Sequence, residues 1–143
     1  METCAMYVFR AKRKNGNRWA FGDLSHMMDG TPCLRTWGDK ADAGLIEIDP
    51  DTLSMSTGLC DHMGNCIFDG DILVREDSFG ECDEKEKLLV VWRDTAAGFV
   101  MHSIYDGEDT GIVDFDDYFF DKVEIVGNIF DDEELLEPEA NDE

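Results

Sequence analysis

The sequence has few positive charges, few prolines and no long hydrophobic run. Its 143 residues include 12 Lys and Arg against 34 Asp and Glu, which gives a formal net charge of −22. Proteins bind nucleic-acid backbones and anionic membranes by placing Lys and Arg against them, so a surface this acidic repels both. No segment approaches the about 18 apolar residues that cross a bilayer. The composition therefore excludes a membrane-spanning helix and argues against direct DNA binding.

The N-terminus lacks the uninterrupted apolar stretch of a secretory signal peptide, because charged and polar residues interrupt residues 1–19. We therefore expect a cytoplasmic protein. The cysteines are five, an odd number, and cytoplasmic cysteines are normally reduced. Free thiols are predicted for the whole set: Cys4, Cys33, Cys60, Cys66 and Cys82.

The charge is unevenly distributed along the chain. Up to Lys40 there are seven Lys or Arg against four Asp or Glu, a balance of +3, and beyond Lys40 there are five against thirty, a balance of −25. The only basic cluster lies in residues 10–18. This asymmetry makes the C-terminal part a poor DNA-binding surface and leaves a small basic strip near the N-terminus.

Apolar residues make up 43% of the chain, with nine Phe, three Trp and three Tyr, which is enough for the core of one domain. Short β-rich runs separated by turn residues predict a mainly β fold (possibly α+β), with antiparallel strands forming a small barrel-like or sandwich core. The expected strands are 5–12, 18–24, 31–37, 44–49, 66–76, 88–94, 99–105 and 122–130. From alternation and aromatic content, the expected core residues are Phe9, Trp19, Phe21, Trp37, Ile67, Ile72, Val74, Val91, Trp92, Phe99, Ile125 and Ile129.

Turns, loops and helices occupy the remaining segments. Two turns join strands as hairpins, at residues 14–17 and 95–98. Residues 77–87 and 106–111 read as charged loops. Helix is expected only at 116–122 and, as a short C-terminal helix, at 131–137, where acids in the first turn suit the helix dipole. Residues 138–143 have nothing to bury and form an expected disordered acidic tail.

Two ligand sets were weighed as metal sites. Zinc would use Cys60, His62, Cys66 and Cys82, but structural zinc sites take ligands in pairs two to four residues apart, and this spacing is too wide. Residues 106–117 place oxygen ligands at the positions of an EF-hand calcium loop, with Gly111 at the sixth position. The preceding segment is β-rich where a helix is required, so calcium remains the weaker reading. Its ligands would be Asp106, Glu108, Thr110, Asp114 and Asp117.

The sequence contains no motif of a catalytic nucleophile, phosphate-binding loop or dinucleotide-binding loop. His26, His62 and His102 stand apart from one another, and the Asp69–Asp71 pair lies in a turn, which is weak support for acid–base chemistry. We therefore expect no enzyme, no catalytic residue and no cofactor.

The segment TGLCDHMGNCIFDGDILV (57–74) resembles the signature of the YopX-like family of phage and prophage proteins. The segments FRAK, WAFGDL, VVWRDTAAGFVM and VEIVGNIFDDEELL are similar to other parts of that family, in the same order. The motif has a physical reading too: Asp61 bonds its own turn, Gly64 and Asn65 take positive φ, and Gly70 bends the chain before a strand. The expected structural residues are Thr57, Gly58, Asp61, Gly64, Gly70, Asp71, Gly127 and Asn128.

The resemblance implies a phage- or prophage-encoded protein in the cytoplasm of a bacterial host, and it carries no catalytic residues. It predicts one domain over 1–137, with an N-terminal β lobe at about 1–56, a barrel-like lobe at about 57–130 and the helix at 131–137.

Three functional classes remain open. The first is a non-catalytic accessory protein that binds another protein, as a homo-oligomer. The second is an acidic DNA mimic that blocks a host nucleic-acid-binding protein. The third is a nucleic-acid-binding small barrel that uses the basic cluster Arg10, Lys12, Arg13, Lys14 and Arg18.

Overall fold

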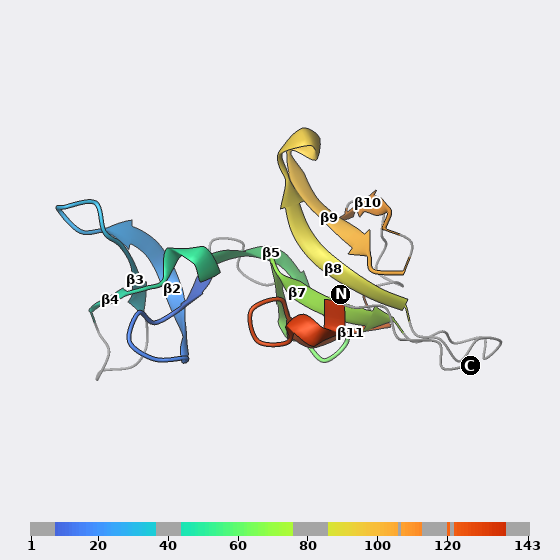
Figure 1. Cartoon of the computed structure of the whole chain (residues 1–143), viewed down its shortest axis with the longest axis horizontal. Coiled ribbons are helices and arrows are strands. Elements are labelled where there is room, and N and C mark those ends of the chain that lie inside the picture. Colours follow the sequence, from blue (N-terminus) through green and yellow to red (C-terminus); the bar gives the residue numbers. More distant parts are fainter. Residues whose placement is uncertain are drawn as a thin grey trace. The chain divides into compact units, whose positions relative to one another are not determined.

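The computed structural model describes residues 8–36, 44–75, 86–105, 107–112, 120 and 122–136. Within them the chain forms two antiparallel sheets and no long helix (Figure 1), which confirms the predicted mainly β fold. The elements are β1 (Phe9–Lys12), β2 (Trp19–His26), β3 (Pro32–Thr36), β4 (Leu45–Glu47), η2 (Pro50–Thr52), β5 (Ser54–Cys60), β6 (Cys66–Phe68), β7 (Asp71–Arg75), β8 (Glu86–Arg93), η3 (Asp94–Ala96), β9 (Gly98–Ser103), β10 (Asp109–Gly111), β11 (Val123–Asn128) and η5 (Glu133–Leu136), where η denotes a 3₁₀ helix.

The chain divides into two compact units. The N-terminal unit is Cys4–Gly58, and the C-terminal unit is Leu59–Glu143 together with Met1–Thr3. The division falls inside β5, so the signature segment 57–74 contributes to both units. None of the helices in the described ranges is long and apolar enough to cross a membrane.

The N-terminal unit contributes the strands β4-β3-β2-β1-β5 to an antiparallel sheet of order β4-β3-β2-β1-β5-β6, whose last strand, β6, belongs to the C-terminal unit. The Asn-Gly turn predicted from KNGN joins β1 to β2, with Gly16 at φ 123° and the Arg13 N–H donating to the Arg18 carbonyl at 3.0 Å. One face of the sheet buries the core of this unit. That core consists of Ala11, Ala20, Leu34 and Ile48, with Phe9, Leu24, Ile46 and Leu53 packed against it.

Thr52 in η2 fixes the end of β1. Its Oγ1 accepts a hydrogen bond from the Lys12 N–H at 2.8 Å and donates to the Asp49 carbonyl at 2.7 Å. Asp49 in turn caps η2 by accepting from the Asp51 N–H. A polar side chain therefore satisfies the backbone where β1 leaves regular pairing.

The C-terminal unit has a five-stranded antiparallel sheet of order β10-β9-β8-β7-β11. The buried side chains of its core are Ile67, Leu73, Leu88, Val90, Met101, Phe120 and Val123. Ile67 comes from β6, so this short strand contributes to the same core as the sheet. Apart from Phe120, which falls in the segment expected to be helical, the core residues come from the strands that the alternating pattern predicted.

The β8–β9 hairpin extends beyond the other strands of this unit and ends in η3 (Figure 1). Near its tip, Trp92 and Phe99 are cross-strand partners whose rings meet edge to face, with centroids 5.3 Å apart. Trp92 is nevertheless 45% exposed. We refer to residues 91–100 as the hairpin arm.

Several expectations require correction. Ile67 and Ile72 are fully buried, but Phe21 is 48% and Trp92 is 45% exposed, so these two were wrongly assigned to the core. The other predicted core residues are partly buried, except Trp37, which lies outside the described residues.

Three elements also differ from the expectation. The expected strand 66–76 is two strands, β6 and β7, separated by a turn at Gly70. Part of the expected loop 106–111 is β10, because pairing with β9 outweighs its low strand propensity. The C-terminal helix is only the four-residue η5, which is too short for α-helical propagation. Most of 77–87, 116–122 and 138–143 lies outside the described residues.

Gly22 in β2 should be indispensable for the N-terminal sheet. A Cβ added there would lie 2.1 Å from the Arg35 carbonyl oxygen, which is backbone and cannot move independently of β3. We expect Gly22→Ala to lower the free energy of unfolding by about 2 to 4 kcal/mol in urea titrations. The matched control is Gly44→Ala, because a Cβ at Gly44 meets nothing within 4 Å. Similar losses for both variants would contradict the steric account.

Candidate functional site

The strongest constellation of polar groups is built around the carboxylate of Asp61. This side chain is only 5% exposed. Its Oδ1 accepts hydrogen bonds from the Met63 and Asn65 N–H groups, both at 2.9 Å, and its Oδ2 accepts from the Ile125 N–H at 3.1 Å. A buried carboxylate is tolerated when such donors replace its hydration. Asp61 therefore ties the turn after β5 to β11.

The turn between Asp61 and Asn65 depends on the left-handed backbone conformation of a glycine. Gly64 has φ 84°, and its N–H donates to the Asp61 carbonyl at 3.0 Å. The Asp61 N–H donates to the Asn65 carbonyl at 2.9 Å, which closes the turn. Positive φ is thus confirmed at Gly64 but wrong for Asn65, because one left-handed residue suffices to reverse this turn.

Gly70 occupies the second bend of the signature, with φ 94°. Its N–H donates to the Val90 carbonyl at 2.7 Å, and its carbonyl accepts from the Ile129 N–H at 2.9 Å. A Cβ at Gly70 would lie 3.4 Å from the Phe130 ring, so the position is closely covered. The backbone of Gly70 therefore joins β8 to the segment after β11.

Asp71 follows Gly70 and is 1% exposed. Its Oδ2 accepts from the Phe68 N–H at 2.7 Å, which holds the bend between β6 and β7. This contact assigns Asp71 to the backbone of its own turn, while its neighbour Asp69 is only half-buried.

In segment 127–132, at the end of β11 and just after it, polar side chains again accept hydrogen bonds from backbone N–H groups. Asn128 Oδ1 accepts from the Phe130 and Asp131 N–H groups at 2.9 and 3.0 Å, and Asp132 Oδ2 accepts from the Asn128 N–H at 3.1 Å. A Cβ at Gly127 would lie 2.5 Å from that Asp132 oxygen. Glycine at 127 therefore leaves room for the turn.

The structure brings most of the sequence-predicted residues together in the C-terminal unit. Asn128 and Asp71 are register partners in the β11–β7 pair, and Gly127 is the partner of Ile72. Thr57 and Gly58 belong instead to the N-terminal unit, where Thr57 is buried and Gly58, at φ 85°, donates its N–H to Ser56 Oγ at 3.1 Å. In both units, the hydrogen bonds described for these residues involve backbone groups.

The structure describes only part of the expected calcium loop. Glu108 is exposed, and Thr110 lies in β10 as the partner of Met101, after a strand rather than a helix. Three of its expected ligands lie outside the described residues: Asp106, Asp114 and Asp117. Among the residues that the structure describes, no three His, Cys, Asp or Glu side chains are grouped to hold a metal ion.

The cysteines differ in state. Cys33 and Cys60 are free and buried, as expected for reduced thiols. Cys66 is disulfide-bonded, against the expectation, and its partner lies outside the described residues. Pairing depends on the distance between two Cβ atoms in the fold, which sequence spacing does not reveal. Cys4 and Cys82 are also outside the described residues.

A second polar cluster was missed by the sequence reasoning. His102 Nδ1 lies 2.7 Å from Asp109 Oδ1, and Arg93 Nε donates to Asp109 Oδ2 at 3.0 Å. His102 and Asp109 are direct partners in the β9–β10 register. These hydrogen bonds, first from His102 and then from Arg93, lower the pKa of the Asp109 carboxyl. The cluster fastens the three-residue edge strand β10 to its sheet.

Asp61 should contribute to stability through its Oδ2 contact. In Asp61→Asn an amide N–H₂ must replace one carboxylate oxygen, and a donor then faces either the turn or the Ile125 N–H. We expect the free energy of unfolding to fall by about 1 to 3 kcal/mol, with faster hydrogen exchange at the Ile125 amide. Glu134→Gln is the control, since this side chain is exposed in η5, away from the turn. An unchanged exchange rate at Ile125 would refute the role of Asp61.

Asp109 should stabilise β10 in a pH-dependent way. Its folded pKa is lowered, so its contribution is fully present above the ordinary Asp value of about 4 and is lost as pH falls through the folded pKa. The melting temperature of Asp109→Asn should lie below that of the parent at pH 7, and the gap should close as the pH falls through the lowered pKa of Asp109. Glu133→Gln, in exposed η5, should show no such closing gap. A gap independent of pH would contradict this account.

The comparisons with known proteins agree with the fold. The family model described as YopX protein matches residues 8–137. The crystal structure of protein EF1440 from Enterococcus faecalis is similar over 93% of this chain and 100% of that chain, with 23% identity and a TM-score of 0.59, which shows a shared fold. No curated protein matches the chain. Because the family match extends over most of the sequence and includes the glycine–aspartate signature, the chain belongs to the YopX family.

Proposed function

We propose that this protein is a non-catalytic accessory protein of a phage or prophage, acting in the cytoplasm of a bacterial host by binding another protein. The observation that carries the proposal is the use of the signature side chains. Asp61 accepts three backbone hydrogen bonds, Asp71 is 1% exposed, and Asn128 Oδ1 accepts from two backbone N–H groups. A general acid or base must reach a substrate. These groups instead hold the fold.

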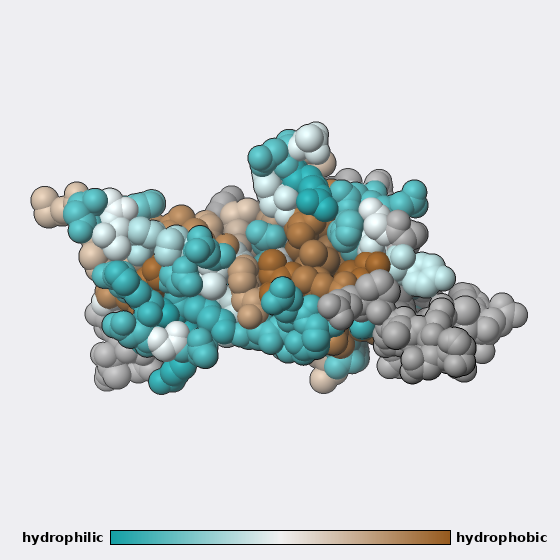
Figure 2. Space-filling model, in the orientation of Figure 1, coloured by the Kyte–Doolittle hydropathy of each residue, from teal (hydrophilic) through white to brown (hydrophobic). Residues whose placement is uncertain are grey.

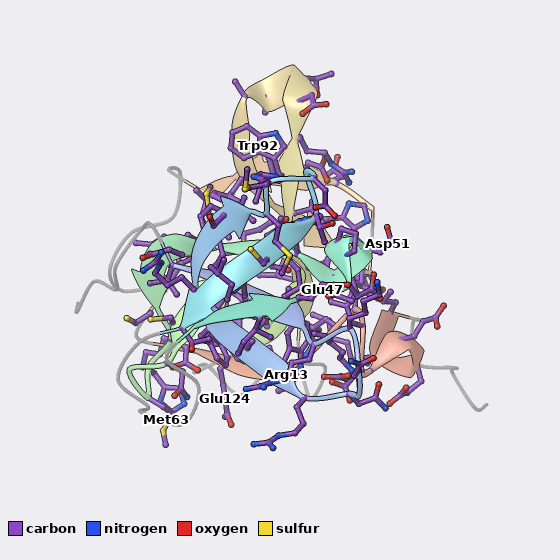
Figure 3. All side chains as sticks on the ribbon, turned by 90° about the vertical axis from the view of Figure 1, so that its left-hand side faces the viewer. Arg13, Glu47, Asp51, Met63, Trp92 and Glu124 are labelled. Carbon is purple, nitrogen blue, oxygen red and sulfur yellow. The ribbon has the colours of Figure 1, made fainter. Side chains whose placement is uncertain are left out.

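The exposed hydrophobic residues of the C-terminal unit support protein binding. Trp and Tyr dominate binding hot spots, and Trp92 on the hairpin arm is 45% exposed. Hydrophobic surface gathers over β8 and β9 beneath a hydrophilic tip (Figure 2), and Trp92 lies on the arm in Figure 3. The other large exposed hydrophobics in this unit are Met63, Tyr105 and Val126. We assign the arm as the main contact with the partner.

Self-association is the second part of the proposal. β4 is the terminal strand in the order of its sheet. At its C-terminal end the Lys14 N–H donates to the Glu47 carbonyl at 3.0 Å, and at its N-terminal end lies Leu45, which is 44% exposed. Terminal strands offer backbone groups for pairing with another chain. A homo-oligomer that pairs copies through β4 would bury Leu45. Multi-angle light scattering of the parent and of Leu45→Lys would reveal it, as a lower mass for the variant.

The segregation of charge favours a DNA mimic as the second candidate. Residues 59–143 carry 26 Asp and Glu against five Lys and Arg, whereas residues 4–58 carry seven of each. A unit with this excess of carboxylates can occupy the basic DNA site of a host protein. Its target would be basic, and binding would weaken as salt rises.

Affinity capture with the Trp92→Ala variant tests the leading proposal. Host proteins retained by the parent chain should be identified, and their dissociation constants measured. Loss of a hot-spot Trp weakens binding by about 30-fold, equivalent to about 2 kcal/mol. Met63→Ala is the matched control, because Met63 is 67% exposed on the β5–β6 turn (Figure 3) and lies off the arm.

The outcomes of this experiment separate the two candidates. Equal binding by Trp92→Ala and the parent would overturn the assignment of the arm. A partner that is displaced by duplex DNA, and whose binding is insensitive to Trp92, would establish mimicry instead. Retention of duplex DNA by the chain itself at about 150 mM salt would contradict both candidates.

A further inference from the structure

The exposed Trp92 ring on the hairpin arm has a carboxylate fixed at its edge. Trp92 Nε1 donates to Asp94 Oδ1 at 2.9 Å, and both side chains are exposed. The Phe99 ring meets the Trp92 ring edge to face, with an angle of 82° between the two planes. The indole is therefore held by a hydrogen bond and by an aromatic contact, while 45% of the residue stays exposed.

The turn at the tip of the arm holds Asp94 in place. Asp94 begins η3, and its carbonyl accepts a hydrogen bond from the Ala97 N–H at 3.1 Å. Ala97 has the left-handed φ of 50° that closes this turn. Among the described residues, no group besides the Trp92 indole bonds to the Asp94 carboxylate. Its second oxygen, Oδ2, is therefore accessible to a donor from another molecule.

The chain itself shows which kind of group covers a tryptophan ring. In the N-terminal unit, Arg10 Cζ lies 4.8 Å from the centroid of the Trp19 ring. No Lys or Arg in the described part of the chain lies over the Trp92 ring in this way. Arg93 points to the opposite face of β8, where its Nε donates to Asp109. The exposed face of Trp92 is therefore accessible to a cation of another chain.

We propose that Trp92 and Asp94 bind an arginine side chain of a protein partner. The inference rests on the proposed role of the hairpin arm as the contact with that partner, and it names the side chain that the arm receives. A guanidinium is planar and weakly hydrated, so it stacks on an indole ring while its N–H groups donate to a carboxylate. A lysine ammonium has no planar face to stack. The Trp92 ring and the Asp94 carboxylate offer both interactions to a single guanidinium.

The charge of the C-terminal unit fits a basic partner. Residues 59–143 carry 26 Asp and Glu against five Lys and Arg, and a field of this sign attracts cationic surfaces. A second copy of the chain would bring the same excess of carboxylates towards Asp94, and like charges oppose each other. An apolar partner could cover the Trp92 ring but would bury the Asp94 carboxylate without a donor for Oδ2. A basic segment with an accessible arginine meets both requirements.

Peptide titration tests the proposal. A labelled peptide of repeated Gly-Ser-Arg units is titrated with the full chain and followed by fluorescence anisotropy at about 50 mM salt, where screening is weak. The same peptide with Lys for Arg has equal charge and should bind more weakly. Trp92→Leu should weaken binding of the arginine peptide about fivefold, as expected for one cation–π contact at an exposed site. It should also remove the preference for arginine over lysine.

Asp94→Asn tests the carboxylate separately. The asparagine carbonyl can still accept from Trp92 Nε1, so this change removes the charge and keeps the indole in place. Binding of the arginine peptide should weaken about threefold, as expected for an exposed ion pair. Glu133→Gln is the matched control, because it removes the same charge from exposed η5, off the arm. It should bind the arginine peptide like the parent.

Nuclear magnetic resonance gives a readout that net charge alone does not move. A guanidinium stacked on the Trp92 ring places the neighbouring arginine methylene protons over the indole, so the ring current should shift their signals upfield. The shift should appear with the parent chain and with Glu133→Gln, and it should be absent with Trp92→Leu. Circular dichroism should show that all three variants fold.

Three results would overturn the arginine assignment. The first is equal affinity for the arginine and lysine peptides. The second is an equal loss of affinity in Asp94→Asn and Glu133→Gln, which would indicate general charge attraction. The third is free L-argininamide that competes as well as the peptide, which would indicate a small-molecule site. A host protein whose capture depends on Trp92 but not on Asp94 would also overturn this assignment, while the arm would remain a contact surface.

Discussion

The C-terminal unit depends on one buried carboxylate. Asp61 joins its own turn to Ile125, a residue 64 positions later in the chain. Next to it, the His62 N–H donates to the Val123 carbonyl at 3.0 Å, so the turn occupies both a donor and an acceptor of β11. β11 is the terminal strand of its sheet, and its outer backbone groups would otherwise face solvent or another chain. The turn after β5 therefore closes this edge, and the register shift between Ile125 and Gly127 follows directly where that contact ends.

The glycines of the signature make this arrangement possible. Gly64 and Gly70 both adopt positive φ, and Gly70 uses its N–H and its carbonyl to join two other segments. A Cβ at either position would be strained by the backbone conformation itself. The signature residues thus shape the backbone. The glycines adopt conformations that the turns require, and the carboxylates accept hydrogen bonds from backbone N–H groups. This explains why a segment rich in Asp, Cys, His and Gly can resemble a metal loop in sequence and form a structural joint in the fold.

The sequence predicted the positions of the strands better than it predicted which of their side chains are buried. Alternation located β8 and β9, and the Asn-Gly turn located the β1–β2 hairpin. The exposure of Phe21 could not be predicted, because the small residues Ala20 and Gly22 occupy the buried positions on either side of it, and at Gly22 the Arg35 carbonyl leaves no room for a Cβ. The contact between Asp61 and Ile125 and the cluster of His102 with Asp109 both depend on register between distant segments, which no local pattern contains. The short β10 forms through that register as well, although its sequence has little strand propensity.

The two units divide the physical chemistry of the chain between them. The C-terminal unit carries almost all of the net negative charge and the exposed Trp92, whereas the N-terminal unit is neutral and places Arg10 and Lys12 over the Trp19 ring. A basic or apolar protein partner fits the properties of the C-terminal unit, whereas the exposed Leu45 in β4 belongs to the N-terminal unit. Because the residues that carry each proposal lie in different units, a substitution in one unit leaves the other surface intact. The proposals that the hairpin arm binds a protein partner and that β4 pairs copies of the chain can therefore fail independently.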